Sequence, residues 1–271
     1  MPEGPECRRI AESLAKFASN RTITSIEILS GRYTKKTPSG LDVITDNIPV
    51  PVAGIGVHGK FIYWILGKEF SIWNTLGMTG SWVAEEHHHN RVRFSFLNGD
   101  HLYFRDQRNF GTLKFVRGKH QLIEKLQSLG PDMLSQEVAD DEFISIFRKR
   151  NKYNICKVLM DQSLVSGIGN YVKADSLWLA KINPHSKVSE LSDLQLKTLK
   201  NSIQEVLKES YRSGGATIRT YQNLDSQKGE YASRFLVYNR KVDSEGNSVV
   251  REPTPDGRTT HWSPAHQTGE L

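Results

Sequence analysis

The hydrophobic pattern changes along the chain, and this change constrains the fold more than any other sequence feature. Residues 4–18 place apolar side chains at helical spacing, with acidic residues in the first turn, where the helix dipole favours them. Residues 22–117 carry six or seven short runs that are rich in β-branched and aromatic residues, several with period two. One helix followed by this many short strands predicts a β-sandwich or a flattened barrel.

The β-rich runs read, in chain order, ITSIEIL, VAGIGV, KFIYWIL, FSIWNTL, RVRFSF, HLYFRD and TLKFV. Asn98-Gly99 separates the fifth run from the sixth. A tight type I′ turn needs positive φ at both central residues, and Asn and Gly adopt such angles readily. We therefore expect a type I′ β-hairpin at this point.

Helical spacing returns in the second half of the chain. Residues 120–129 form one predicted helix, which the Gly and Pro of LGPDML stop, and residues 140–211 form an all-helical region. A chain of 271 residues is too long for one comfortable hydrophobic core. We predict an N-terminal domain over 1–130, a linker over 131–139, a helical domain over 140–231 that ends in a loop (213–231), and a finger over 232–271.

The predicted finger contains three short strand-like pieces, RFLVYNRK, SVVRE and GRTTHW, joined by turns. These pieces indicate a small β-ribbon with almost no core of its own. Only Cys7 and Cys156 are present in the chain, so a disulfide framework is excluded and a reducing compartment is expected. No apolar run of about 20 residues occurs, which argues against a membrane protein, and the acidic start MPEGPE does not resemble a signal peptide.

The charge of the chain is suggestive without being decisive. Lys and Arg outnumber Asp and Glu by 36 to 30, which gives a net charge of +6. Such a balance favours polyanionic partners but does not require them. The nature of the partner must therefore come from the placement of particular residues.

Several separated motifs stand in a recognisable order. PEGPE opens the chain, GIGN occupies 167–170 and GRTT occupies 257–260, with GKFIYW, LGMTG, DQRNFG and GGATIRTY between the ends. In this set and order the sequence resembles the formamidopyrimidine-DNA glycosylase and endonuclease VIII family of base-excision repair enzymes. The resemblance implies an α+β fold with an N-terminal helix and β-sandwich, a helix-two-turns-helix domain and a C-terminal β-ribbon finger. It also implies a monomer that acts inside the cell on damaged double-stranded DNA and needs no cofactor.

The first motif also makes chemical sense on its own. Removal of Met1 would leave Pro2 with a free secondary amine, and an α-amino group has a reference pKa of about 7.7–8.0, far below that of lysine. Such an amine can attack the sugar C1′ of a damaged nucleotide and form a Schiff-base-type intermediate. Glu3 can then donate and accept protons during opening of the sugar ring. An ordinary helix-start proline followed by a dipole-favoured acid is the alternative interpretation.

The resemblance implies further roles for particular residues. Lys60 of GKFIYW and Arg258 of GRTT would contact the phosphates that flank the lesion. Met78, Arg108 and Phe110 would fill the space that an extruded base leaves. The remaining residues predicted to contact DNA are Lys157, Gly169, Asn170 and Tyr238. GIGN precedes a helix, and backbone N–H groups at a helix N-terminus attract phosphate.

The finger departs from its relatives, because most of them hold zinc there with four cysteines. Residues 234–271 contain no cysteine, so we predict a zincless finger. His261 and His266 could bind a metal with an acid such as Asp243, but their spacing matches no recognised pattern. The tract His87-His88-His89 is more typical of a solvated loop.

The sequence leaves the substrate class open. PEGPE is typical of the endonuclease VIII branch, which prefers oxidised pyrimidines, whereas Met78, Arg108, Phe110 and the loop after Gly214-Gly215 resemble the branch that prefers oxidised purines such as 8-oxoguanine. We favour oxidised purines slightly. A non-catalytic damaged-DNA-binding protein is a rival, although binding alone needs neither Pro2 nor Glu3. A metabolic hydrolase lacks support, since no nucleophile elbow, P-loop or HExxH motif occurs.

Overall fold

The computed structural model describes residues 2–216 and 229–269. Its contacts divide the chain into two compact units. The first unit comprises residues 1–2, 6–128 and 214–229, and the second comprises residues 3–5, 129–213 and 230–271. In the described part of the chain, no helix combines the length and the apolar character that crossing a membrane requires.

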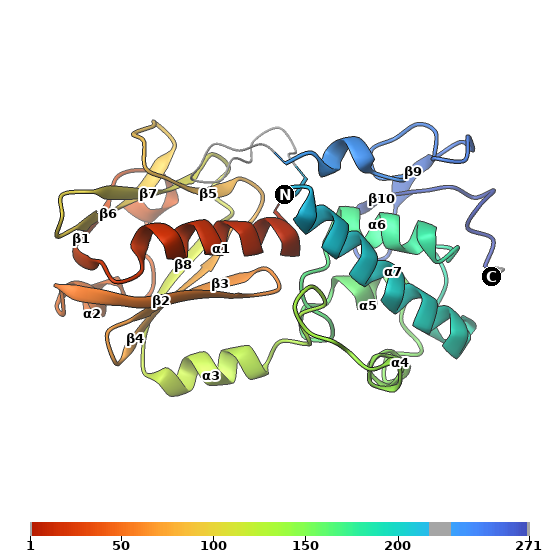
Figure 1. The fold of residues 1–271 in the computed structure, drawn as a ribbon, viewed down its shortest axis with the longest axis horizontal. Coiled ribbons are helices and arrows are strands. Elements are labelled where there is room, and N and C mark those ends of the chain that lie inside the picture. The colour runs from red at the N-terminus through yellow and green to blue at the C-terminus, as the bar shows by residue number, and fades with distance from the viewer. Residues whose placement is uncertain (1, 217–228, 270–271) are drawn as a thin grey trace. The chain divides into compact units, whose positions relative to one another are not determined.

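The first unit is built on an eight-stranded antiparallel sheet in the order β5-β7-β6-β1-β2-β3-β4-β8 (Figure 1). Strands β1 and β2 share only two Cα pairs, so the sheet bends there into two four-stranded halves. The strands are β1 (Thr22–Ile28), β2 (Val50–His58), β3 (Phe61–Leu66), β4 (Phe70–Thr75), β5 (Gly80–Val83), β6 (Asn90–Phe96), β7 (His101–Asp106) and β8 (Thr112–Arg117). The smaller helices of this unit are α2 (Leu41–Thr45), α3 (Lys119–Gln127) and a 3-10 turn, η1 (Gly31–Thr34).

The core of the first unit lies between the two halves of the sheet. Trp64 of β3 packs against Trp82 of β5 and Phe94 of β6, with ring centroids 5.1 and 5.9 Å apart. Helix α1 (Gly4–Ala18) adds Ile10 and Leu14 to the same core, and Figure 1 shows it lying along the strands. The predicted β-sandwich is confirmed, with one more strand than the patterns indicated, because β5 has only four residues and follows a glycine-rich turn.

The turn at Asn98-Gly99 differs from the prediction. Gly99 has a φ of +87°, but Asn98 is not among the described residues with positive φ, which excludes a type I′ turn. Phe96 N–H donates to the Asp100 carbonyl, and Gly99 N–H donates to the Phe96 carbonyl. The hairpin therefore closes through a longer loop with Gly in the left-handed position, which is the next most common hairpin geometry.

The second unit is helical and carries the finger. Its helices are α4 (Asp140–Arg148), α5 (Ile155–Met160), α6 (Asn170–Leu179) and α7 (Asp193–Arg212), with 3-10 turns η2 (Val188–Glu190) and η3 (Tyr231–Arg234). A reciprocal capping box between Ser192 and Gln195 starts α7. The segment 131–139, which we expected to be a linker, packs into this unit, since Met133 and Val138 are buried.

The finger has two strands, β9 (Val250–Pro253) and β10 (Thr259–Trp262), which pair antiparallel. The prediction of a strand in RFLVYNRK is wrong. The backbone N–H groups of Leu236, Val237 and Tyr238 all donate to the carboxylate of Asp175 on α6, at 3.0–3.2 Å, and so have no strand partner. Three donors on one carboxylate bend the chain around it, and this bend holds the finger on α6.

Trp82 provides a test of the sandwich core. Its ring contacts three aromatic rings, and its indole N–H donates to Asn74 Oδ1 at 3.0 Å. Trp82→Ala should lower the free energy of unfolding by about 3–5 kcal/mol because it opens a cavity. Trp82→Phe should cost about 1–3 kcal/mol, because it leaves the buried Asn74 oxygen unpaired.

Urea unfolding followed by circular dichroism would measure both effects. Trp73→Phe is the matched control, since Trp73 is only half-buried and its N–H reaches Ser71 Oγ. Equal losses for Trp73→Phe and Trp82→Phe would contradict the assignment of Trp82 to the centre of the core.

Candidate functional site

Glu3 lies at the N-terminus of helix α6 in the second unit. Its Oε1 accepts a hydrogen bond from Tyr171 N–H at 3.0 Å, and its Oε2 accepts one from Val172 N–H at 3.2 Å. The residue is 2% exposed. Two backbone donors and the positive end of the helix dipole favour the carboxylate anion and fix its orientation.

Gly169 permits this arrangement for a steric reason. A Cβ atom at Gly169 would lie 2.2 Å from Glu3 Cδ, which is an impossible contact. One residue further along, Gly4 N–H donates to the Gly167 carbonyl at 2.9 Å. The glycines of GIGN therefore leave room for the chain around Glu3. The N–H groups of Tyr171 and Val172, at the helix start where we expected phosphate to bind, donate to Glu3 instead.

Asn170 and Tyr238 lie beside the same helix start. Asn170 Nδ2 donates to the Thr259 carbonyl at 2.9 Å, next to Arg258 in the finger. The Tyr238 ring is half-buried and lies 5.1 Å from the ring of His261. Burial raises the pKa of Tyr238, and the negative charge of Glu3 adds to this effect. The structure thus brings Glu3, Gly169, Asn170, Tyr238 and the Arg258 loop together within the second unit.

Arg258 and Lys157 are the two cations predicted for this unit. Arg258 is exposed and ends the loop between β9 and β10. Lys157 is exposed on α5, with its Nζ 5.4 Å from the centre of the Tyr153 ring. Both residues lie on the surface of the second unit.

The first unit holds Pro2 and Lys60. Pro2 is buried and directly precedes Glu3 in the chain. Gly59 and Lys60 form the two-residue turn between β2 and β3, where His58 pairs with Phe61. Gly59 has a φ of +56°, the left-handed conformation that a tight hairpin needs at its first central residue. Lys60 therefore lies in a tight turn and is half-buried.

Met78, Arg108 and Phe110 lie on two neighbouring loops of the first unit. Met78 is 38% exposed and Phe110 is 53% exposed, so neither belongs to the core. The Arg108 guanidinium lies 4.9 Å from the centre of the Phe110 ring. Accessible apolar side chains on glycine-flanked turns suit insertion into a base stack.

Asp106 and Thr79 join these two loops. Thr79 Oγ1 donates to Asp106 Oδ1 and accepts from Arg108 N–H at 3.0 Å. Asp106 Oδ2 accepts from Gly111 N–H at 2.6 Å. The Met78 turn and the Arg108–Phe110 loop are therefore fixed to each other by one carboxylate, a role that the sequence analysis did not identify.

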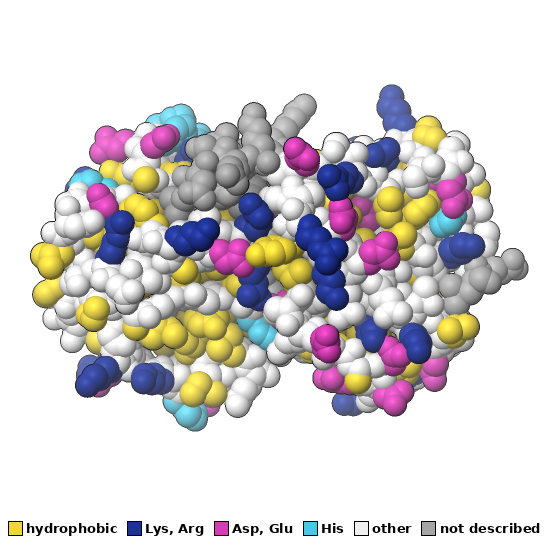
Figure 2. Space-filling model, viewed as in Figure 1, with side chains coloured by type: hydrophobic (Ala, Val, Ile, Leu, Met, Phe, Trp, Pro, Cys, Tyr) yellow, Lys and Arg dark blue, Asp and Glu magenta, His cyan; other side chains and the backbone are white. Residues whose placement is uncertain are grey.

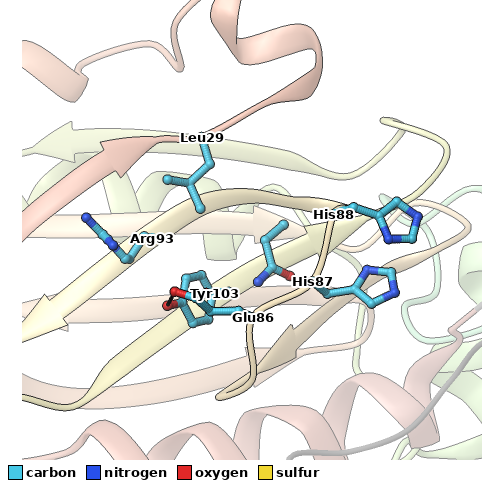
Figure 3. Close-up of a pocket in the computed structure, with 7 residues that line it drawn as sticks. Leu29, Glu86, His87, His88, Arg93 and Tyr103 are labelled. Atoms are coloured by element: carbon cyan, nitrogen blue, oxygen red, sulfur yellow. Dashed lines mark hydrogen bonds between the residues drawn. The ribbon is translucent and has the colours of Figure 1, made fainter.

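The histidine tract borders an open cavity of about 430 Å³ in the first unit (Figure 3). The rings of His87 and His88 are 4.1 Å apart and extend away from Arg93 and Tyr103. Partial desolvation and the charge of His88 lower the pKa values of His87 and His89 from the ordinary histidine value. Within residues 2–216 and 229–269, no three His, Cys, Asp or Glu side chains are arranged to hold a metal ion.

The finger residues do not fit a zinc site. Residues 234–271 contain no cysteine. His266 Nδ1 lies 2.9 Å from Glu245 Oε2 and its Nε2 lies 3.1 Å from the Trp178 carbonyl. Asp243 accepts from Trp178 Nε1 at 3.1 Å and from Asn247 N–H at 2.8 Å. Asp243 and His266 each bind protein atoms, while His261 packs against Tyr238.

Basic and acidic side chains are interspersed on the face shown in Figure 2, both over α1 and over α7. Where the structure describes this face, the net charge of +6 does not gather into one basic surface over these helices. On this face, any contact with a polyanion would therefore be made by individual cations.

Comparisons with known proteins decide the family. The "Formamidopyrimidine-DNA glycosylase N-terminal domain" matches residues 1–113, and the "Formamidopyrimidine-DNA glycosylase H2TH domain" matches residues 129–222. A formamidopyrimidine-DNA glycosylase of Mycoplasma mobile is 30% identical over 271 residues, which cover 97% of each chain. The chain belongs to the formamidopyrimidine-DNA glycosylase family. Membership of this family makes it a DNA glycosylase of base excision repair.

Solved structures agree with this assignment. The chain is similar to a Lactococcus lactis FPG mutant in complex with a Fapy-dG containing DNA, with a TM-score of 0.88, 27% identity, and coverage of 98% and 99% of the two chains. It is also similar to the MutM (FPG) protein from Thermus thermophilus, with a TM-score of 0.87, 26% identity, and complete coverage of both chains. The predicted family and the α+β fold are confirmed.

The pH dependence of stability tests the hydrogen bonds that Trp178 and Asn247 donate to Asp243 in this glycosylase. Burial raises the pKa of Asp243, but hydrogen bonds from Asn247 and Trp178 outweigh burial and lower it from 3.8 to about 2. Because the folded-state pKa is depressed, the carboxylate stabilises the fold above about pH 4 and loses this contribution as the pH falls through about 2. Asp243→Asn should be less stable than the wild type at pH 7, and the gap should close between pH 4 and pH 2.

Thermal unfolding of both proteins across this pH range would measure the gap. Glu137→Gln is the control, because Glu137 is an exposed carboxylate of the same unit that lies outside this cluster. A gap between Asp243→Asn and the wild type that is unchanged at pH 2 would contradict the assigned hydrogen bonds.

Proposed function

We propose that the protein is a bifunctional DNA glycosylase and apurinic/apyrimidinic-site lyase that removes oxidised bases from duplex DNA. The observation that carries this proposal is the position of Glu3, whose carboxylate is held by two backbone N–H groups directly after Pro2. A nucleic-acid-binding protein without catalysis needs no such fixed carboxylate beside an amine.

The proposed reaction begins at the Pro2 nitrogen, once Met1 has been removed. Its lone pair forms a bond to C1′ of the damaged nucleotide, and the glycosidic bond breaks with its electrons leaving on the base. Opening of the sugar ring, with a proton supplied to O4′, then gives an iminium ion. Glu3 is placed to donate and accept protons in these steps. β- and δ-elimination from the iminium would cut the strand on both sides of the lesion.

The remaining predicted residues would bind the DNA. Lys60 and Arg258 would contact phosphates that flank the lesion, as would Lys157. Met78 and Phe110 would enter the stack where the base is extruded, and Arg108 would bond the orphaned partner base. The exposure of Met78 and Phe110, and the Asp106 contacts that fix their loops, support the roles of these two residues and of Arg108.

We favour oxidised purines as substrates, with oxidised pyrimidines as the alternative. The similar solved structures include MutM with DNA that contains carbocyclic 8-oxo-G, besides the Fapy-dG complex. The loop that we expect to cap a flipped purine falls on 213–231, and its residues 217–228 lie outside the described part of the chain.

Borohydride trapping on a duplex with an abasic site tests the lyase mechanism. The untagged protein should form a covalent adduct, because borohydride reduces an iminium to a stable amine. An N-terminal extension that places the Pro2 nitrogen in an amide bond should abolish the adduct. Pro5→Ala is the matched control, since Pro5 lies in the first turn of α1 and its nitrogen is always an amide.

Mass spectrometry of the purified protein would establish that Met1 is absent before trapping. An adduct of equal yield from the extended protein would contradict Pro2 as nucleophile. DNA binding without any adduct would favour the non-catalytic alternative.

Comparison of lesions tests the substrate class. Duplexes with 8-oxoguanine should be cleaved at least several-fold faster, by kcat/KM, than duplexes with thymine glycol. An abasic duplex serves as the reference, because its cleavage needs no base recognition. Faster cleavage at thymine glycol would place the enzyme in the pyrimidine branch.

A further inference from the structure

A buried ion pair joins helix α6 to the finger loop that carries Arg258. Lys173 Nζ lies 2.6 Å from Asp256 Oδ2, and the two side chains are 0% and 2% exposed. Exposed ion pairs contribute little, whereas removal of one partner from a buried pair leaves a charge without compensation. This pair therefore constrains the loop in a way that the exposed pairs of this unit do not.

Asp256 passes this constraint to the backbone of Arg258. Its Oδ1 accepts a hydrogen bond from Thr254 Oγ1 at 2.6 Å. Thr254 N–H donates to the Arg258 carbonyl at 2.9 Å, and the same carbonyl lies 3.1 Å from Thr254 Oγ1, whose single proton points to the closer Asp256 oxygen. The loop from 254 to 258 is thus closed on itself around the Asp256 carboxylate.

Helix α6 holds this loop at two points on one face. Residues three apart on a helix are neighbours on its surface, so Asn170 and Lys173 project on the same side. Asn170 binds the Thr259 carbonyl on one side of Arg258, and Lys173 binds Asp256 on the other. The backbone of Arg258 is therefore fixed on both sides, although its side chain is exposed.

Neither residue of the pair has another evident function. Lys173 is fully buried and so is closed to DNA. Burial opposes ionisation of Asp256, but hydrogen bonds from Lys173 and Thr254 hold its pKa below 3.8, so it remains charged at neutral pH. A buried charged pair between α6 and the finger calls for a functional explanation, since apolar side chains of similar size often give equal stability.

We propose that Lys173 and Asp256 are positioning residues that orient Arg258 towards the DNA phosphate, in place of the metal ion that cysteines would hold. This proposal rests on the proposed function, because it assumes that Arg258 binds a phosphate. The pair acts only through Arg258, so its removal should remove the contribution of Arg258 to DNA binding.

The salt dependence of DNA binding tests this directly. Loss of one phosphate contact reduces the slope of log Kd against log salt concentration by about 1. Arg258→Ala should show this reduction on a duplex with a reduced abasic site, and Asp256→Asn should show the same reduction. Arg258→Ala in the Asp256→Asn background should produce no further change, because coupled residues are not additive.

Two further proteins separate positioning from stability. Lys173→Met/Asp256→Asn leaves no buried charge unpaired, so it should keep the wild-type circular dichroism spectrum and a cooperative melting transition while its slope is reduced by about 1. Glu209→Gln is the matched control, since it breaks the exposed Arg234–Glu209 pair of the same unit. The control should leave the slope unchanged.

A wild-type slope in folded Lys173→Met/Asp256→Asn would overturn the proposal, as would fully additive effects of Asp256→Asn and Arg258→Ala. An unchanged slope for Arg258→Ala alone would also overturn it, because Arg258 would then make no phosphate contact for the pair to position. Failure of the lyase mechanism is a different result: no borohydride adduct would form, while the slopes would still report on Arg258.

Discussion

Helix α6 is the element on which the rest of the second unit depends, because its first amides and three of its side chains hold other segments. The amides of Tyr171 and Val172 bind Glu3. Asn170 and Lys173 bind the finger loop that carries Arg258, and Asp175 binds residues 236–238. Eight of its ten residues are buried. Polar groups in such a helix need partners, since an unpaired buried charge is strongly destabilising. Helix α6 can therefore be buried only if the finger is attached to it, because residues of the finger pair with its buried polar groups.

The Asp175 carboxylate illustrates how this requirement is met. Burial raises its pKa to about 6, while three backbone N–H groups favour its charged form. The same three bonds leave residues 236–238 without a strand partner. One buried carboxylate thus replaces a short strand and determines where the finger begins.

The sequence predicted the elements well where periodicity was strong and the run was long. Helix α1 and the long strands of the sandwich follow directly from apolar spacing. Strand β5 and the turn at Asn98 were harder, because four residues carry little pattern and a turn type depends on a single φ angle. The strand expected in RFLVYNRK failed for a different reason: its alternating apolar residues pack inward, but a side chain distant in sequence takes its hydrogen bonds.

The candidate site likewise divides into residues that a local motif predicts and residues whose contacts are distant in sequence. Short motifs predict roles for Pro2, Glu3, Lys60 and Arg258, whereas the contacts of Thr79, Asp106, Lys173 and Asp256 could not be predicted in this way. These four residues act through contacts between residues 27 to 83 positions apart, which no local pattern reveals. The sequence predicts a DNA contact for Gly169, and the structure shows that the absence of a side chain there makes room for Glu3.

The absence of cysteine from residues 234–271 has a consequence for where such an enzyme works. Oxidised bases arise under the same conditions that convert thiolates to sulfenic and higher acids. A finger held by zinc thiolates is exposed to the oxidants whose damage it repairs. The carboxylates, the lysine and the asparagine that join this finger to α6 do not undergo this thiol chemistry, so these contacts do not depend on the redox state of a thiolate.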